Sequence, residues 1–203
     1  MGKAEILYRQ IAYELLDAGG KNEFTQIGLA RKFGFSTSTV SNALMPLEGI
    51  GAVQVGRSGF RVTDAEKLLL YWASTRTLSK DVAMRLYVKA PASEIERSLP
   101  PGIVFTAYTG FRRRFGEAPA DYGEVYAYAG EKEIRESVKR LSARPAEENA
   151  NLVFLRHDEF LDGISSKSVA PTGVLFVDLW NLRQWYARDF VNALKRRLAK
   201  WFE

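Results

Sequence analysis

The sequence predicts an α+β protein: a helix-turn-helix with a small hairpin, followed by a mixed α/β C-terminal domain. Residues 4–51 show helical periodicity interrupted by glycines, and two short segments of alternating residues follow. Proline usage also changes, because Pro46 is the only proline in the first 90 residues and six others follow it. Beyond residue 80, apolar strand-like runs alternate with helical patterns. These observations predict a change of architecture near residue 80.

The first 63 residues predict three helices and a hairpin. Apolar residues recur at helical spacing from Ala4 to Leu15, and Gly19-Gly20 supplies the expected stop. Thr25 and Ser36 are placed to cap a second and a third helix. Segments 52–55 and 60–62 alternate as strands and are joined by the turn at 56–59. This order of elements is that of a winged helix.

Residues 64–80 predict a connecting helix. Thr63 to Glu66 have the spacing of a capping box, and the stretch 68–73 that follows is apolar on nearly every side. Such a helix must be covered, by the second domain or by another copy of the protein. For the domain at 81–203 we expect strands at 84–88, 125–129, 152–155 and 174–179, and helices at 91–99, 131–141 and over the last 20 residues. Residues 103–108 are ambiguous.

The composition excludes several kinds of chemistry. The 203 residues include no cysteine and one histidine, so thiolate nucleophiles and cysteine zinc sites are excluded, and a Ser-His-Asp triad would depend on His157 alone. We therefore expect no catalytic residues, no metal and no cofactor. The net charge of +5, divided as +3 before residue 80 and +2 after it, suggests an acidic partner. No run approaches the ~20 apolar residues of a membrane span, so we expect a cytoplasmic protein without a membrane partner.

The strongest constellation is the helix-turn-helix itself. Ala30, Gly34 and Val40 have the spacing of a small crossing residue, a turn residue tolerant of positive φ, and a branched anchor. With these inward, five side chains point outward as candidate base readers: Thr37, Ser38, Ser41, Asn42 and Met45. Among them, the amide of Asn42 suits an adenine edge. The alternative is an ordinary pair of core helices, but the hairpin after them favours a winged-helix DNA-binding domain at 1–63.

Positive charge flanks this segment without entering it. No Lys or Arg occurs between Lys32 and Arg57, so phosphate contacts would come from Arg31, Lys32, Arg57 on the wing, and Arg61. We also expect Pro46 to kink or shorten the third helix.

Other candidate sites carry weaker signals. Arg112, Arg113 and Arg114 lie between two phenylalanines, as in nucleic-acid or partner-binding patches, although the pattern favours a solvated helix end. His157, Asp158, Glu159 and Asp162 form a cluster that suggests acid-base or metal chemistry, without a second histidine to support it. Asp178 follows an apolar run, where it serves either as a functional carboxylate or as a helix cap.

Two features near the C-terminus are expected to be structural. The basic residues of the last helix complement its dipole and face solvent; they are Arg188, Lys195, Arg196, Arg197 and Lys200. The four tryptophans are expected in the core or at an interface; they are Trp72, Trp180, Trp185 and Trp201.

Several segments together resemble a known family. They are Leu47 to Val53, Leu70 to Ser74, Phe105 to Tyr108, Pro119 to Tyr122, and Phe176 to Ala187. The chain is similar in these to archaeal transcriptional regulators grouped with the AbiEi antitoxins of type IV toxin-antitoxin systems. The resemblance implies a winged-helix domain that represses its own operon and a C-terminal domain that, in true antitoxins, opposes a nucleotidyltransferase toxin.

Three functional hypotheses follow from the sequence. The first is a regulator that binds double-stranded DNA in a sequence-specific way as a homodimer, since a two-fold operator roughly doubles the contacts. The second is a protein-interaction module that neutralises a nucleotidyltransferase toxin. The third, least supported, is a nucleotide-handling C-terminal domain that uses Asp178 or Asp158 with Arg112 to Arg114, because no glycine-rich phosphate loop occurs.

Overall fold

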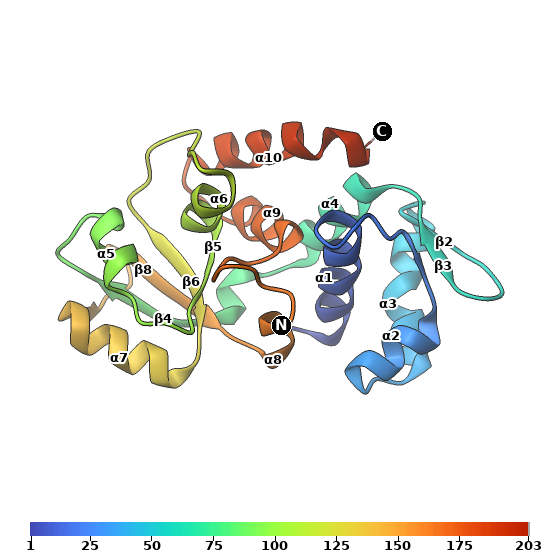
Figure 1. The fold of residues 1–203 in the computed structure, drawn as a ribbon, viewed down its shortest axis with the longest axis horizontal. Helices are drawn as coiled ribbons and strands as arrows, with labels where there is room; N and C mark the ends of the chain where they lie inside the picture. Colours follow the sequence, from blue (N-terminus) through green and yellow to red (C-terminus); the bar gives the residue numbers. More distant parts are fainter. Residues whose placement is uncertain (203) are drawn as a thin grey trace. The chain divides into compact units, whose positions relative to one another are not determined.

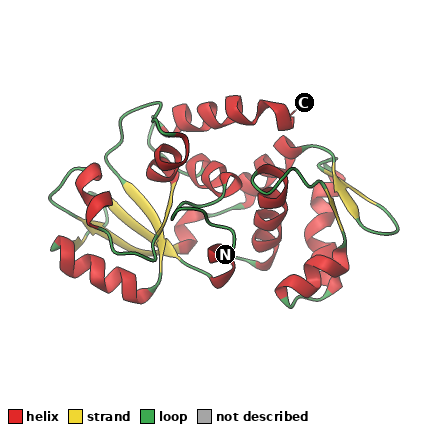
Figure 2. Ribbon diagram, viewed as in Figure 1, coloured by secondary structure: helices red, strands yellow, loops and turns green. Residues whose placement is uncertain are grey.

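The computed structural model describes residues 1–202 and shows an α+β protein with ten α-helices and two sheets in that range (Figure 1; Figure 2). Contacts between residues divide the chain into two compact units, which we call unit 1 (Met1–Arg76 with Leu194–Glu203) and unit 2 (Thr77–Ala193). None of the helices described is long and apolar enough to cross a membrane.

Unit 1 contains four helices and a three-stranded sheet ahead of the C-terminal end of α10. In chain order these are α1 (Lys3–Leu16), β1 (Glu23–Phe24), α2 (Gln26–Phe33), α3 (Thr37–Gly49), β2 (Val53–Val55), β3 (Phe60–Val62) and α4 (Ala65–Thr75). The strands lie in the order β1-β3-β2, and both pairings are antiparallel. The three helices and the hairpin predicted from the sequence are therefore all present, and β1 adds a third strand that was not predicted.

The predicted start of α4 needs a correction at its cap. Asp64, not Thr63, is the N-cap residue, and its Oδ1 accepts a hydrogen bond from the Lys67 amide at 2.9 Å. Thr63 instead donates its hydroxyl to the Gly51 carbonyl oxygen, at 3.0 Å. Thr63 and Asp64 are adjacent residues that can both cap a helix. Because the Thr63 hydroxyl is bonded to Gly51, just after α3, Asp64 takes the cap position.

Unit 2 is a five-stranded sheet with helices on both faces. Its elements are η1 (Leu78–Asp81), β4 (Val82–Tyr87), α5 (Ala92–Ser98), β5 (Val104–Thr106), α6 (Ala107–Phe115), β6 (Val125–Ala129), α7 (Glu131–Leu141), β7 (Arg144–Pro145), β8 (Leu152–Arg156), α8 (Glu159–Asp162), α9 (Thr172–Trp180) and the beginning of α10 (Ala187–Phe202). The strand order is β5-β6-β8-β4-β7, and only β6 and β8 run parallel.

The interior strand β6 shows how the layers of unit 2 are built. Val125, Ala127 and Ala129 join a core cluster with residues of α5 and α7. Tyr128 points the other way, because its hydroxyl bonds to Asp178 on α9. All five residues of β6 are buried, as expected for a strand covered on both faces.

The prediction of a strand at 174–179 is wrong. Residues Thr172–Trp180 form α9, and eight of its nine residues are buried. A helix covered all round has no polar face, so the run of apolar residues carries no 3.6-residue period that would distinguish it from a buried strand. The ambiguous residues 103–108 contain the end of a strand and the start of a helix, since β5 passes directly into α6 at Ala107.

Candidate nucleic-acid interface

The turn between α2 and α3 adopts the geometry that its sequence predicts. Gly34 lies at φ 65° and ψ 28°, a left-handed conformation that glycine adopts without strain. Ala30 and Val40 are both buried, at 5% and 0% exposure. The amide of Phe35 donates to the Ala30 carbonyl oxygen at 2.9 Å, which closes the end of α2. The three spacing residues therefore occupy the positions that a helix-turn-helix needs.

The outward face of the first turns of α3 is polar and uncharged, and the exposed Met45 and Glu48 follow toward the end of the helix. All five predicted base readers are exposed: Thr37, Ser38, Ser41, Asn42 and Met45. Ser36 caps the helix by accepting from the Thr39 amide at 3.1 Å, and its hydroxyl lies 2.8 Å from that of Ser38. Ser38 is thus partly engaged in the cap, while Met45 has 64% of its surface exposed.

Helix α1 fixes α3 from behind. The buried Tyr8 hydroxyl donates to the Ala43 carbonyl oxygen at 2.8 Å, and burial raises the pKa of that hydroxyl above its ordinary value, so it remains a donor. Leu44 and Leu47 are buried on the same side of α3. Pro46 was expected to kink or shorten this helix, yet α3 continues past it to Gly49. The length of the exposed face is therefore preserved.

The hairpin turn places Arg57 beside the start of α3. The turn closes with a hydrogen bond from the Gly56 amide to the Gly59 carbonyl oxygen at 2.8 Å. A hollow of about 480 Å³ is lined by Thr25, Gln26, Ile27, Thr37, Gly56, Arg57, Ser58 and Gly59. The exposed Arg57 of the turn thus shares one surface with the first residues of α2 and α3. Helix N-termini and an arginine are both suited to a phosphate.

Ile27 is a member of this surface that the sequence analysis missed. It has 63% of its surface exposed and lies in the first turn of α2, two residues after the Thr25 cap. An apolar side chain in an amphipathic helix is normally assigned to the core, and its position one residue after Gln26 gave no contrary signal. Together with Met45, it provides an apolar group where a thymine methyl group can be contacted.

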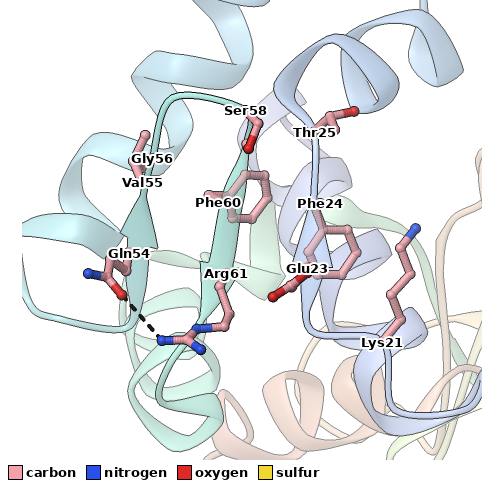
Figure 3. A pocket seen from close by; sticks show the side chains of 11 residues that line it. Lys21, Glu23, Phe24, Thr25, Gln54, Val55, Gly56, Ser58, Phe60 and Arg61 are labelled. Carbon is pink, nitrogen blue, oxygen red and sulfur yellow. Dashed lines mark hydrogen bonds between the residues drawn. The ribbon is translucent and has the colours of Figure 1, made fainter.

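Arg61 lies in a different hollow from Arg57. It stands between Glu23 and Gln54 in the sheet register, and its Nη2 donates to Gln54 Oε1 at 3.4 Å (Figure 3). A groove of about 590 Å³ over this part of the sheet is lined by Lys21, Glu23, Phe24, Thr25, Gln54, Val55, Gly56, Ser58, Gly59, Phe60 and Arg61. The two predicted phosphate-binding arginines of the hairpin therefore line different hollows, which share Thr25, Gly56, Ser58 and Gly59.

The two cations at the end of α2 also differ. Arg31 and Lys32 are both exposed, but Lys32 Nζ lies 3.7 Å from a carboxylate oxygen of Glu14. Lys21 contacts the same carboxylate at 2.8 Å. Burial alone would raise the pKa of Glu14, but hydrogen bonds from Lys21 and Gln10 and the two lysine charges lower it. Glu14 thus offsets part of the charge that Lys32 was expected to offer.

The arginine run at 112–114 belongs to a bonded network in unit 2. Glu96 is 3% exposed and accepts hydrogen bonds from Thr109 at 2.7 Å, from Tyr122 at 2.8 Å, and from Arg112 Nη2. Arg112 Nε also donates to the Tyr122 hydroxyl oxygen at 2.8 Å. Burial would lower the pKa of Arg112, but Tyr122 and Glu96 raise it.

The other two arginines lie at the edge of this network. The Arg113 guanidinium stacks 3.9 Å from the Phe105 ring centroid, and its Nη2 donates to the Glu96 backbone oxygen at 3.4 Å. Arg114 is half-buried. The sequence analysis missed Glu96, because a glutamate on a short amphipathic helix carries no signal of burial.

The acidic candidates of unit 2 do not form one site. Asp178 lies within α9 rather than at the start of a helix, so its expected role as a helix cap is wrong. It is 1% exposed and accepts from the hydroxyls of Thr106 at 2.7 Å and Tyr128 at 2.8 Å. His157 Nε2 lies 2.8 Å from Asp162 Oδ1. Within residues 1–202, no group of three histidine or acidic side chains is arranged to hold a metal ion.

The tryptophans divide between core and surface. Trp72 is fully buried in unit 1, and Trp201 is half-buried. In unit 2, Trp180 is 44% exposed and Trp185 is 80% exposed. Trp72 therefore lies in the core, whereas a place for Trp180 and Trp185 at an interface stays a prediction.

Comparisons of the chain with protein-family models, with curated proteins and with solved structures give no match.

Proposed function

We propose that the protein is a sequence-specific DNA-binding transcriptional regulator whose unit 1 is a winged helix. The observation that carries the proposal is the surface shared by the start of α3 and Arg57, with an uncharged row of polar side chains beside a cation. Hydrogen-bonding groups without charge distinguish base edges, whereas a flanking arginine binds the backbone of any sequence. That division of labour is what specific recognition requires.

Individual roles follow from the positions of the side chains. Thr37, Ser41 and Asn42 read base edges in the major groove, and Ser38 contributes through its capping hydroxyl. Met45 and Ile27 contact thymine methyl groups. Arg57 and Arg31 bind phosphates, while Lys32 and Arg61, which already have partners in the protein, contribute less.

Selection of bound fragments from genomic DNA by the purified protein tests this function. We expect enrichment of a two-fold symmetric sequence, since a dimer would place one reading helix on each half-site. Asn42→Ala should cost about 1–3 kcal/mol on the selected sequence and relax one base position. The control, Asn149→Ala in an exposed loop of unit 2, should leave the preference unchanged. No enrichment over random fragments at moderate salt would contradict the proposal.

The resemblance to AbiEi antitoxins extends the proposal to biological context. An autorepressor acts in the cytoplasm on the promoter of its own operon. A reporter fused to that promoter should rise in expression when the chain is deleted and fall again when it is restored. An unchanged reporter would separate DNA binding from autoregulation.

A second candidate function is protein interaction by unit 2, with a nucleotidyltransferase toxin as the partner. The observation that favours it is Trp185, which has 80% of its surface exposed and packs its ring edge to face on Tyr186. Large exposed aromatic side chains are characteristic of the centres of protein interfaces. Co-purification with a neighbouring nucleotidyltransferase should be lost in Trp185→Ala and kept in Trp72→Phe; retention in Trp185→Ala would contradict this role.

The structure supplies no support for nucleotide chemistry in unit 2. The buried carboxylate of Asp178 bonds to Thr106 and Tyr128, while Arg112 bonds to Glu96 and Tyr122. These groups belong to separate clusters, and we do not propose an enzymatic role for them.

A further inference from the structure

The net positive charge of the protein arises entirely in unit 1. Counted from the sequence, unit 1 has 13 basic and 8 acidic residues, for a net charge of +5, whereas unit 2 has 16 of each. Residues 194–203 alone contribute four basic residues and one acidic residue to unit 1. The end of α10 is therefore the most concentrated source of the surplus.

The end of α10 is held in unit 1 by an ion pair and by an aromatic contact. Lys195 Nζ lies 2.8 Å from Glu66 Oε1 on α4. The Trp201 ring packs on Gly20 so closely that a Cβ atom at Gly20 would lie 2.8 Å from Trp201 Cη2. Leu194 and Leu198 are buried on the inner side. These contacts fix which face of the helix is turned outward.

Two cations occupy the outward face. Arg196 and Lys200 are exposed and stand four residues apart, so their side chains leave the same side of the helix one turn apart. Lys200 Nζ lies 5.0 Å from the Trp201 ring centroid, and no acidic residue occurs between Asp189 and Lys200. By contrast, the charges of Lys195 and Lys21 are offset by Glu66 and Glu14. Arg196 and Lys200 thus form a surface of net positive charge.

We propose that Arg196 and Lys200 form a second contact with the DNA backbone, outside the α3 and hairpin surface. The spacing of the two cations, about 5–6 Å between Cβ atoms on neighbouring turns, suits successive phosphates of one strand. Contacts to phosphates carry no sequence information directly, so they provide attraction to any sequence rather than selectivity. This inference rests on the proposed DNA-binding function, and it names a part of the chain that the helix-turn-helix pattern does not include.

The competing explanation is that these cations only stabilise the helix, since positive side chains near a helix C-terminus complement its dipole. The double variant R196Q/K200Q separates the two roles. Its affinity is measured between 50 and 200 mM salt for a selected duplex and for a random duplex of the same length. Each lost phosphate contact lowers the salt slope of log affinity by about 0.9, so we expect a decrease of roughly 1.8 for each bound protomer on both duplexes.

Three further measurements complete the test. Arg188→Gln changes an exposed arginine of the same helix within unit 2, and it should leave the slope unchanged. R196K/K200R keeps both charges and should retain wild-type binding, and thermal unfolding checks that every variant is folded.

An unchanged slope in folded R196Q/K200Q overturns the inference and leaves the proposed function intact. Wild-type protein that binds both duplexes equally overturns sequence-specific recognition instead, and binding to neither duplex overturns both.

Discussion

Arg57 in unit 1 and Arg112 in unit 2 were both candidate binding residues in the sequence, yet the structure places them in opposite environments. Arg57 is exposed at a turn beside two helix N-termini. Arg112 is fixed by a buried glutamate and a tyrosine. The first residue is available to a partner, while the second compensates the burial of a carboxylate. The comparison teaches that a basic residue near aromatics indicates an interface only when its charge has no acidic partner inside the protein.

The largest expected effect tests the compensating role of Arg112. Glu96→Ala should destabilise the protein by about 3 kcal/mol, because three donors lose their acceptor and one of them is charged. Urea denaturation measures the loss. Glu96→Gln keeps the shape and an acceptor oxygen, so it should cost less than Glu96→Ala. A cost below about 1 kcal/mol for Glu96→Ala would show that the network contributes little to stability.

A second prediction disturbs the packing of the hairpin that carries Arg57 and leaves the charge of Arg57 unchanged. A Cβ atom at Gly59 would lie 2.1 Å from the Phe24 carbonyl oxygen, so Gly59→Ala must separate β1 from the hairpin. We expect a loss of about 1–3 kcal/mol in stability and weaker DNA binding. Gly56→Ala is the matched control, since its nearest contact would be an ordinary 3.8 Å. Equal effects of the two substitutions in denaturation and binding assays would contradict this account.

A third prediction compares the two arginines directly in DNA binding. Arg57→Ala should reduce the salt slope by about 0.9 for each bound protomer and weaken binding to selected and random duplexes alike. Arg112→Ala should leave the slope unchanged, provided that thermal unfolding shows the variant to be folded. If Arg112→Ala lowers the slope as much as Arg57→Ala does, the arginine run at 112–114 belongs to the interface after all.

The smallest expected effect concerns the ion pairs of Glu14. Because its pKa is lowered in the folded protein, the carboxylate contributes stability above the pKa of the unfolded chain, about 4.3, and this contribution is lost as the pH falls through the lower folded value. Glu14→Gln should remove that part of the acid dependence and free the charge of Lys32. Unfolding measured from pH 7 to pH 3 would show the difference, and parallel curves would contradict it.

The sequence predicted the first half of the fold well because its signals are local. Thr25, Ser36 and Gly34 determine helix ends through contacts within a few residues, and each has the predicted position in the structure. Local patterns did not predict α9, because a helix that is buried on all sides shows no 3.6-residue hydrophobic period. They also did not predict contacts between residues that are distant in the chain. No pattern around Glu96 in the sequence indicates that it pairs with Arg112, which lies 16 residues away on another helix. The candidate site residues of α3 were predictable because one helix face determines them all.

The charge distribution illustrates the same limit at the level of domains. A division of the linear sequence near residue 80 shared the surplus almost evenly, whereas the units of the folded chain hold +5 and 0. The difference arises because residues 194–203 return to the N-terminal unit. A count along the chain cannot detect such a return, since it depends on contacts such as that of Trp201 with Gly20.

The return of α10 to unit 1 also has a consequence for biosynthesis. Leu194 is added 118 residues after Arg76, at about 5–20 residues per second, so unit 1 waits roughly 6–24 s for its last helix while unit 2 is being made. During that interval the surface that later receives Trp201 and Leu198 is uncovered. The most basic segment of unit 1 is therefore synthesised after α3 and the hairpin have had time to form.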